Sequence, residues 1–326
     1  TEGANLPRIN YENGCGSWLL EDESTNLVPY SSDFSNASWL KENNATLGLN
    51  TYLSPSGENN ASELNLPNTL SRITYVFNTT GVYTFSVYLR SDTNGTISIR
   101  SATGSPSVEQ QVSLTDKWQR FDVSVTDGNY WQVIKKSSDT LTSIYVWGAQ
   151  LEEQSYATSY IPTSGASSTR LQDIATDSGN STLINSTEGT LYAEIAALEN
   201  SGESIRAISL GVNGDNSQTI TIRFRNQNNS IGLFMKPLSP NNLNLSTQAF
   251  NILNFNKIAL KYKSGEIALW INGTEVITST NTLNIVGLNK LDFNAVGSSN
   301  FFGKVKALAV YKEALTDAEL TALTTI

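Results

Sequence analysis

Acidic side chains are the first candidates for chemistry, because paired carboxylates can act as general acid and base. Glu152 and Glu153 are neighbours in a stretch of strand character, so their side chains point to opposite sides. Glu21 and Glu23 have the spacing of one strand face, but they lie in a polar segment where we expect solvated side chains. The sequence has no histidine and one cysteine, Cys15, which excludes catalytic triads built on either residue type. We therefore expect a protein that is not an enzyme.

The second half of the chain offers residues suited to binding a ligand. Ile267, Leu269 and Ile271 share one face of a predicted strand, so Trp270 must project from the other face. The same alternation places two arginines on an outer face within residues 219–226. An aromatic ring beside cationic side chains is suited to binding a glycan, and an exposed tryptophan is equally typical of a contact with the first domain or with a neighbouring subunit. The predicted glycan-binding surface of this half consists of Trp270, Lys261, Arg223 and Arg225.

The first half has a second set of aromatic and cationic residues. Tyr88 and Arg90 alternate with Phe85 on the strand predicted for residues 82–90, and an aromatic pair follows a turn at residues 127–129. Tyr145 and Trp147 alternate with Ile144 and Val146, which is compatible with an outward binding face, but large aromatic side chains are mostly buried, so we interpret both as core residues. Trp39 and Trp118 are interpreted as core or edge anchors. The candidate glycan-binding residues of this half are Tyr88, Arg90, Tyr130 and Trp131.

The elements that must position these residues are strands throughout. Short alternating runs recur at the spacing of a β-sandwich, and the strand predicted from residue 143 leads through Gly148 to an exit ending at Pro162. We predict an all-β chain with a tether at residues 1–24, a jelly roll of about eight strands at 25–163, and a second sandwich at 164–326. Within this second sandwich, residues 164–182 read as a linker. A capping box of Thr316 and Glu319 predicts one short C-terminal helix.

Composition limits the classes of partner. The net charge is −9 and the 21 basic residues are scattered, which argues against nucleic acid, because phosphate binding needs a clustered basic surface. No stretch approaches the roughly 18 apolar residues of a membrane span, and we expect no membrane insertion. The N-terminal residues also lack the layout of a signal peptide.

Several runs resemble a family of bacteriophage and prophage virion proteins. They are STNLVPYSSDFSNASW at 24–39, GAQLEEQSYATSYIPTSG at 148–165 and LINSTEGTLYAEI at 183–195. Residues 257–276 and 304–323 resemble the middle strands, and the last strand with the terminal helix, of laminin G-like domains. The resemblance implies a carbohydrate-binding-module-like jelly roll followed by a laminin G-like, concanavalin A-type sandwich.

The resemblance also implies a setting and partners. We expect a non-catalytic phage tail or fibre protein, extracellular as part of the virion, that binds glycans at the host surface. Its other expected partners are virion proteins and its own copies, as in a homo-trimer. The alternatives are a purely structural assembly module and a binding part of a secreted bacterial polysaccharide-degrading protein. No cofactor is required, although both domain types often hold structural calcium, for which Asp33 and Glu152 are the candidate ligands.

Overall fold

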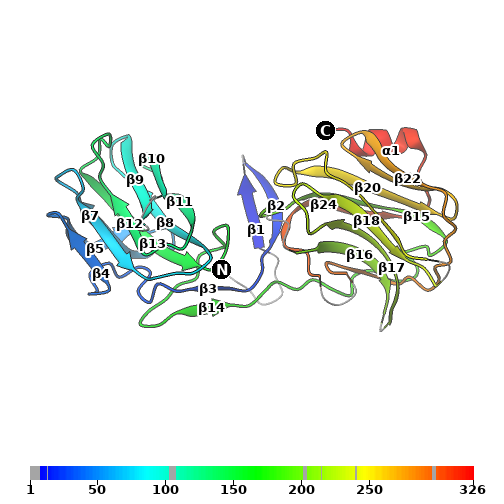
Figure 1. The fold of residues 1–326 in the computed structure, drawn as a ribbon, viewed down its shortest axis with the longest axis horizontal. Helices are drawn as coiled ribbons and strands as arrows, with labels where there is room; N and C mark the ends of the chain where they lie inside the picture. Colours follow the sequence, from blue (N-terminus) through cyan, green and yellow to red (C-terminus); the bar gives the residue numbers. More distant parts are fainter. Residues whose placement is uncertain are drawn as a thin grey trace. The chain divides into compact units, whose positions relative to one another are not determined.

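The computed structural model describes residues 8–12, 14–102, 108–200, 204–213, 215–238, 241–295 and 299–326 (Figure 1). The chain divides into two compact units. The first sandwich is formed by residues 23–171, and the second sandwich combines residues 8–22 with residues 172–326. No helix in the described ranges has the length and apolar character that a bilayer crossing requires.

The first sandwich consists of two five-stranded antiparallel sheets that enclose one apolar core. Side chains alternate along each strand, and the inward ones, such as Phe85 and Trp131, meet between the sheets. The β12 sheet has the order β10 (Val108–Leu114), β9 (Gly95–Ala102), β12 (Tyr130–Ile134), β7 (Arg72–Val76) and β4 (Trp39–Glu42). The β8 sheet has the order β11 (Gln119–Thr126), β8 (Val82–Arg90), β13 (Ser143–Glu152), β6 (Asn59–Asn65) and β5 (Thr46–Leu53).

The predicted strand at residues 143–152 is β13, and it lies at the centre of the β8 sheet as expected. Its pairing with β8 shifts between Trp147 and Gln150, where Gly148 has a φ of 64°. A side chain on Gly148 would be strained by this backbone conformation, so glycine permits the bulge. The bulge keeps both Trp147 and Gln150 on the outer face of the sheet.

The second sandwich pairs a seven-stranded sheet with a five-stranded one around a second core. Leu260 and Leu269 from one sheet meet Ile222 and Phe224 from the other in this core. The β20 sheet has the order β1 (Arg8–Glu12), β2 (Cys15–Leu20), β24 (Gly303–Tyr311), β15 (Glu188–Ala196), β20 (Asn256–Lys263), β21 (Ile267–Ile271) and β22 (Thr274–Ser279). The β17 sheet has the order β19 (Leu243–Thr247), β18 (Ile231–Lys236), β17 (Asp215–Phe224), β16 (Arg206–Val212) and β23 (Lys290–Asp292).

The N-terminal residues are not a tether, and this prediction was wrong. Strands β1 and β2 pair with each other, and β2 pairs with β24 of the second sandwich. Leu20 is buried in the core of the second sandwich, whereas Trp18 is 46% exposed. Arg8 forms ion pairs with Glu21 and Asp173, which join the hairpin to the chain that re-enters this domain.

The linker predicted at residues 164–182 is divided between the two domains. β14 (Ser168–Arg170) pairs with β3 (Ser24–Asn26) within the first sandwich. Beyond the boundary at residue 171, the Asp173 N–H donates to the Glu21 carbonyl at 2.9 Å, and Ser178 forms a bridge with Leu291. The polar composition of this stretch predicted a free linker. The prediction failed because the contacts are made by backbone groups, which side-chain composition does not report.

The C-terminal helix α1 (Asp317–Thr324) begins at the predicted capping box. The Thr316 side chain accepts a hydrogen bond from the Glu319 N–H, and the Glu319 carboxylate accepts one from the Thr316 N–H. Leu320 is fully buried against the outer face of the β20 sheet. The helix therefore covers part of that face (Figure 1).

Candidate functional site

Trp270 does not lie on an exposed surface, which contradicts the prediction. It does project away from the main core, as the alternation of β21 requires, but helix α1 covers that side of the sheet. The side chain is 8% exposed and packs with Tyr192, Ala259 and Leu320. Its indole N–H has no hydrogen-bond partner among the described residues. Trp270 is therefore a structural contact between the sheet and the helix.

Of the other three predicted residues of this domain, only Lys261 shares the outer sheet face of Trp270. The Lys261 ammonium donates to the Asp317 carboxylate at 3.0 Å, at the beginning of helix α1. Arg223 and Arg225 lie on and directly after β17, in the other sheet of the sandwich. Because Trp270 and Arg223 project from the outer faces of opposite sheets, the predicted grouping was wrong.

Two of the four predicted residues of the first sandwich are also misplaced. Trp131 is fully buried in the core, where its indole N–H donates to the Phe77 carbonyl at 3.0 Å. Tyr130 is 45% exposed, but it belongs to the β12 sheet. Tyr88 and Arg90 belong to the β8 sheet, so the structure does not bring the four residues together.

Tyr88 and Arg90 lie on the outer face of the β8 sheet together with aromatic residues that the sequence did not assign to a site. Inward residues of β13, Ile144 and Val146, fill the core, so Tyr145 points outward and is paired with Arg90 across the ladder. Neither Tyr145 nor Trp147 faces the core between the sheets, which contradicts the interpretation, although Trp147 is buried and Trp39 lies in the core as expected. We call the following residues of this surface the aromatic face: Tyr52, Glu63, Arg90, Asp92, Trp118 and Tyr145.

Arg90 is at the centre of the aromatic face. Its guanidinium carbon lies 4.0 Å from the centre of the Tyr145 ring and 5.5 Å from that of Trp118. The guanidinium also pairs with the Asp92 carboxylate at 3.0 Å. A cation between two aromatic rings holds both rings in place through its attraction to their electron-rich faces.

Hydrogen bonds fix the edges of the aromatic face. The Tyr145 hydroxyl donates to Asp92 at 2.7 Å, and the Tyr52 hydroxyl donates to Glu63 at 3.1 Å. The rings of Tyr52 and Tyr145 are 4.6 Å apart. The Trp118 indole N–H donates to the Leu53 carbonyl at 3.0 Å. Each large ring is thus oriented by a polar contact at its rim, while all three remain partly exposed.

These contacts change the acidity of the two tyrosines. The hydrogen bond to the Asp92 carboxylate, with partial desolvation and the charge of Asp92, raises the pKa of Tyr145 to about 12. The hydrogen bond to Glu63 and the charge of that carboxylate raise the pKa of Tyr52. Both phenols therefore remain hydrogen-bond donors at neutral pH.

A second aromatic cluster continues this surface along β8 and β13. The Trp147 ring lies 4.5 Å from that of Tyr160 and 5.4 Å from that of Tyr88. Trp147 is only 5% exposed, because these two rings cover it. The Arg120 guanidinium stacks 5.4 Å from the centre of the Tyr88 ring. Tyr88 is part of this packed aromatic cluster beside the aromatic face, and its side chain is partly exposed.

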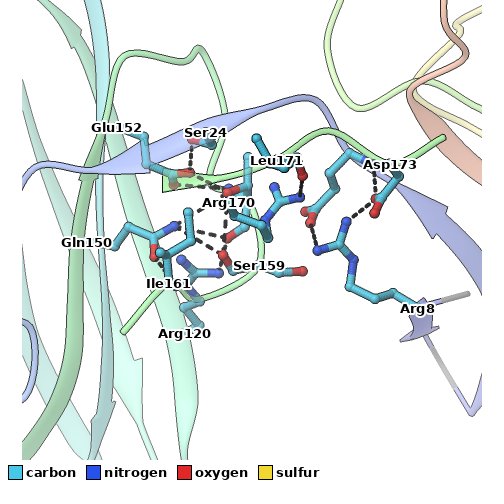
Figure 2. A network of polar contacts seen from close by, with 12 residues as sticks. Arg8, Ser24, Arg120, Gln150, Glu152, Ser159, Ile161, Arg170, Leu171 and Asp173 are labelled. Carbon is cyan, nitrogen blue, oxygen red and sulfur yellow. Dashed lines mark hydrogen bonds and ion pairs between the residues drawn. The ribbon is translucent and has the colours of Figure 1, made fainter. Parts of the chain in front are cut away.

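The two candidate calcium ligands are occupied by separate hydrogen bonds. Buried Glu152 accepts bonds from the Ser24 hydroxyl, at 2.6 Å, and from the Thr158 hydroxyl and N–H (Figure 2). Asp33 accepts bonds from the N–H and hydroxyl of Ser35. Among the described residues no group of three or more acidic or cysteine side chains is placed to hold a metal ion. A structural calcium ion stays a prediction. If it is bound, adding EGTA should lower the melting temperature of the protein.

The polar network around Glu152 positions the exit of β13. The Gln150 side-chain oxygen accepts a hydrogen bond from the Ile161 N–H at 2.6 Å, and Arg120 donates to the Thr158 carbonyl (Figure 2). The Arg120 guanidinium also donates to the Ser86 hydroxyl at 2.8 Å. Residues 158–161 are thereby attached to the outer face of the β8 sheet, where Tyr160 covers Trp147.

The second sandwich is also recognisable by comparison. Residues 171–321 match the family model of the concanavalin A-like lectin/glucanases superfamily. The second sandwich is a concanavalin A-like domain. A search of curated protein sequences found no match.

Solved structures show only weak similarity. The CBM40 of the Ruminococcus gnavus IT-sialidase, bound to α2,3-sialyllactose, has 20% identity and a TM-score of 0.39, covering 47% of this chain and 95% of that one. Domain 4 of the Geobacillus stearothermophilus arabinanase AbnA, in complex with arabinotriose, has 17% identity and a TM-score of 0.39, covering 52% and 80%. A SAP-like pentraxin from Limulus polyphemus has 14% identity and a TM-score of 0.36, covering 45% and 72%. Similarity at this level does not extend to the ligand.

Proposed function

We propose that the protein binds neutral glycans through the aromatic face of the first sandwich. The observation that carries the proposal is the arrangement of Tyr145 and Trp118 on either side of Arg90, on a sheet face that the described chain leaves partly open. Flat, partly exposed rings offer an apolar surface for the C–H face of a sugar. The surrounding side chains supply hydrogen-bonding groups for its hydroxyls.

The charges of the aromatic face favour a neutral ligand. Arg90 is its one cation, and the Asp92 carboxylate pairs with it. Glu63 adds a second carboxylate, which accepts hydrogen bonds from Tyr52 and Ser143. An anionic sugar would therefore meet no uncompensated positive charge on this surface.

The superfamily of the second sandwich supports a carbohydrate ligand in general terms, because its description includes lectins. It does not locate the glycan. The two residues predicted there for sugar stacking and support, Trp270 and Lys261, contact helix α1 instead. We therefore place the neutral-glycan site in the first sandwich.

The test is a glycan array on the intact chain, followed by calorimetric titration of the neutral oligosaccharide that binds. We expect Tyr145→Ala and Trp118→Ala each to weaken binding about tenfold or more, since each removes a ring of the platform. Tyr130→Ala is the matched control, because Tyr130 is exposed on the other sheet. The proposal is wrong if no neutral glycan binds, or if the two ring variants bind as tightly as the control.

The setting we propose is the virion of a bacteriophage, where this binding would attach the particle to its host. The runs at residues 24–39, 148–165 and 183–195, which resemble virion proteins, support this assignment. Virion partners and assembly into a trimer belong to the same proposal. Detection of the chain in purified phage particles, with sedimentation analysis of its oligomeric state, would test them. A catalytic domain for polysaccharides in the same reading frame would instead favour a secreted bacterial protein.

A further inference from the structure

A pair of arginines projects from the outer face of the β17 sheet in the second sandwich. The inward residues of β17, Ile220, Ile222 and Phe224, are buried in the core, so Arg223 projects from the opposite face. Arg225 follows two residues later, with a partly exposed side chain. The two guanidinium groups therefore belong to one region of the sheet.

Neighbouring strands hold both guanidinium groups in place. Arg223 donates from Nη2 to the Asn244 side-chain oxygen at 2.5 Å, and it lies 4.8 Å from the centre of the Phe234 ring. Arg225 donates from Nη1 to the Ser246 hydroxyl at 2.8 Å. These partners are neutral and come from β18 and β19. The Nε atoms of both arginines have no hydrogen-bond partner within the described ranges.

The charge of this pair is uncompensated. In the part of the chain that the structure describes, neither arginine forms an ion pair with a carboxylate, although the protein as a whole carries a net charge of −9. Arg223 is only 7% exposed. Burial, and then the positive charge of Arg225, lowers the pKa of Arg223 to about 10, so it remains a cation at neutral pH. A buried charge beside a like charge is unfavourable unless an anion joins them.

We propose that Arg223 and Arg225 form a binding site for the carboxylate or sulfate group of an acidic saccharide. The planar guanidinium matches the geometry of either oxyanion, and the Nε–H groups of both arginines are buried donors without a partner among the described residues. Asn244 and Ser246 add amide and hydroxyl groups that suit sugar hydroxyls. This site lies in a different domain from the aromatic face and does not depend on the function proposed for that face.

The experiment is calorimetric titration of the intact chain with three oligosaccharides of similar length: a uronic acid oligomer, a sulfated galactan oligomer and a neutral galactan oligomer. We expect binding of at least one acidic oligomer, weakened by added salt, and little binding of the neutral one at this site. Binding of the uronate alone would assign a carboxylate site, and binding of the sulfated oligomer alone a sulfate site. Both outcomes support the proposal.

Variants assign the binding to the arginine pair. Arg225→Gln is expected to weaken acidic-oligomer binding about tenfold or more, and Arg225→Lys to restore only part of it, because lysine keeps the charge but not the planar fork. Lys263→Gln is the matched control, with the same charge change on the other sheet of the same domain. A thermal melt of each variant identifies any loss of folding, and Arg225 is preferred over buried Arg223 for that reason.

Three results would overturn the proposal. The first is that neither acidic oligomer binds the wild-type chain. The second is that Arg225→Gln binds the acidic oligomers as tightly as Lys263→Gln does. The third is that a poly-glutamate peptide binds the wild-type chain more tightly than the acidic oligomers do, and binds the Arg225→Gln variant more weakly. That result would assign the site to acidic peptides.

Discussion

Tyr145 and Trp270 are both large aromatic residues on the outward side of a strand, and their surroundings differ completely. Tyr145 remains partly open on the aromatic face, where Arg90 and Asp92 orient it. Trp270 is closed off by helix α1, and its indole N–H has no hydrogen-bond partner among the described residues. The alternation of a strand decides the direction of a side chain, but it does not decide what covers that side.

The surroundings of Arg90 and of the pair Arg223 and Arg225 also differ, in the charge of the groups that contact each guanidinium. Arg90 lies beside a carboxylate, whereas Arg223 and Arg225 have only neutral partners among the described residues. Two arginines on outer sheet faces can therefore suit different ligands, one neutral and one anionic.

The largest expected effect tests whether Trp270 is structural. Trp270→Ala should lower the free energy of unfolding of the second sandwich by about 3 to 5 kcal/mol, because it leaves a cavity beneath helix α1. Trp270→Phe should cost much less, since it keeps a ring and removes the unpaired N–H. Calorimetric melts of both variants, with Trp118→Ala as the partly exposed control, provide the measurement. If Trp270→Ala and Trp118→Ala lowered the free energy of unfolding equally, Trp270 would not be the more structural of the two residues.

Leu20→Ala tests which sandwich includes the N-terminal hairpin. Leu20 is buried in the core of the second sandwich, so we expect a loss of about 2 to 4 kcal/mol in the unfolding of that domain. Ile9→Ala, at an exposed position of the same hairpin, should cost far less. Hydrogen exchange would locate the change, and faster exchange confined to residues 23–171 would contradict the observed pairing.

Thr316→Ala should destabilise helix α1, which covers Trp270, by less than either of the preceding changes. Loss of the cap costs about 1 kcal/mol in typical helices. The hydrogen bonds from Thr316 lower the pKa of Glu319, so its stabilising charge is present above its ordinary value of 4.5 and lost as pH falls through the lowered pKa. We therefore expect the difference in melting temperature between wild type and Glu319→Gln to shrink on acidification. A difference that grows toward low pH would contradict the cap.

The smallest effect concerns the phenol of Tyr145. Its folded pKa of about 12 lies above the ordinary value of 10, so the hydrogen bond to Asp92 is fully present below pH 10 and lost as pH rises through 12. The absorbance difference between wild type and Tyr145→Phe should show a tyrosine that ionises near pH 12. Asp92→Asn should lower that midpoint. An unchanged midpoint would mean that Asp92 does not hold Tyr145.

The sequence predicted most of the fold, because the strands of the second sandwich alternate clearly and the helix has a complete cap. Asn272 and Gly273 form the tight turn between β21 and β22, and both have positive φ, which asparagine and glycine adopt readily. Strands β5 and β6 were missed, because polar residues such as Asn60 and Ser62 give β6 little apolar alternation, and irregular pairing interrupts β5. The hairpin β1–β2 was missed because its partner β24 is almost 300 residues away in the chain.

The site was harder to predict than the fold. Tyr88 and Arg90 were assigned from alternation alone, and the aromatic face contains Arg90. Tyr145 and Trp118 were interpreted as buried or edge residues, because average burial does not account for a sheet face that the described chain leaves partly open. The spacing of Tyr145 with Ile144 and Val146 contained the signal, since two inward residues leave it only the outer side.

The pairing of β3 with β14 determines how the first sandwich would respond to tension along the chain. Ser24 pairs with Arg170, so the chain enters and leaves this domain at adjacent points. A pull on residues 22 and 172 would load the short ladder from this end and separate one residue pair after another. The Ser24 hydroxyl also donates to Glu152 of β13 at 2.6 Å, so this end of the ladder would pass part of the load to the β8 sheet. Under tension the ladder and its bond to β13 would therefore be the first elements of this sandwich to open.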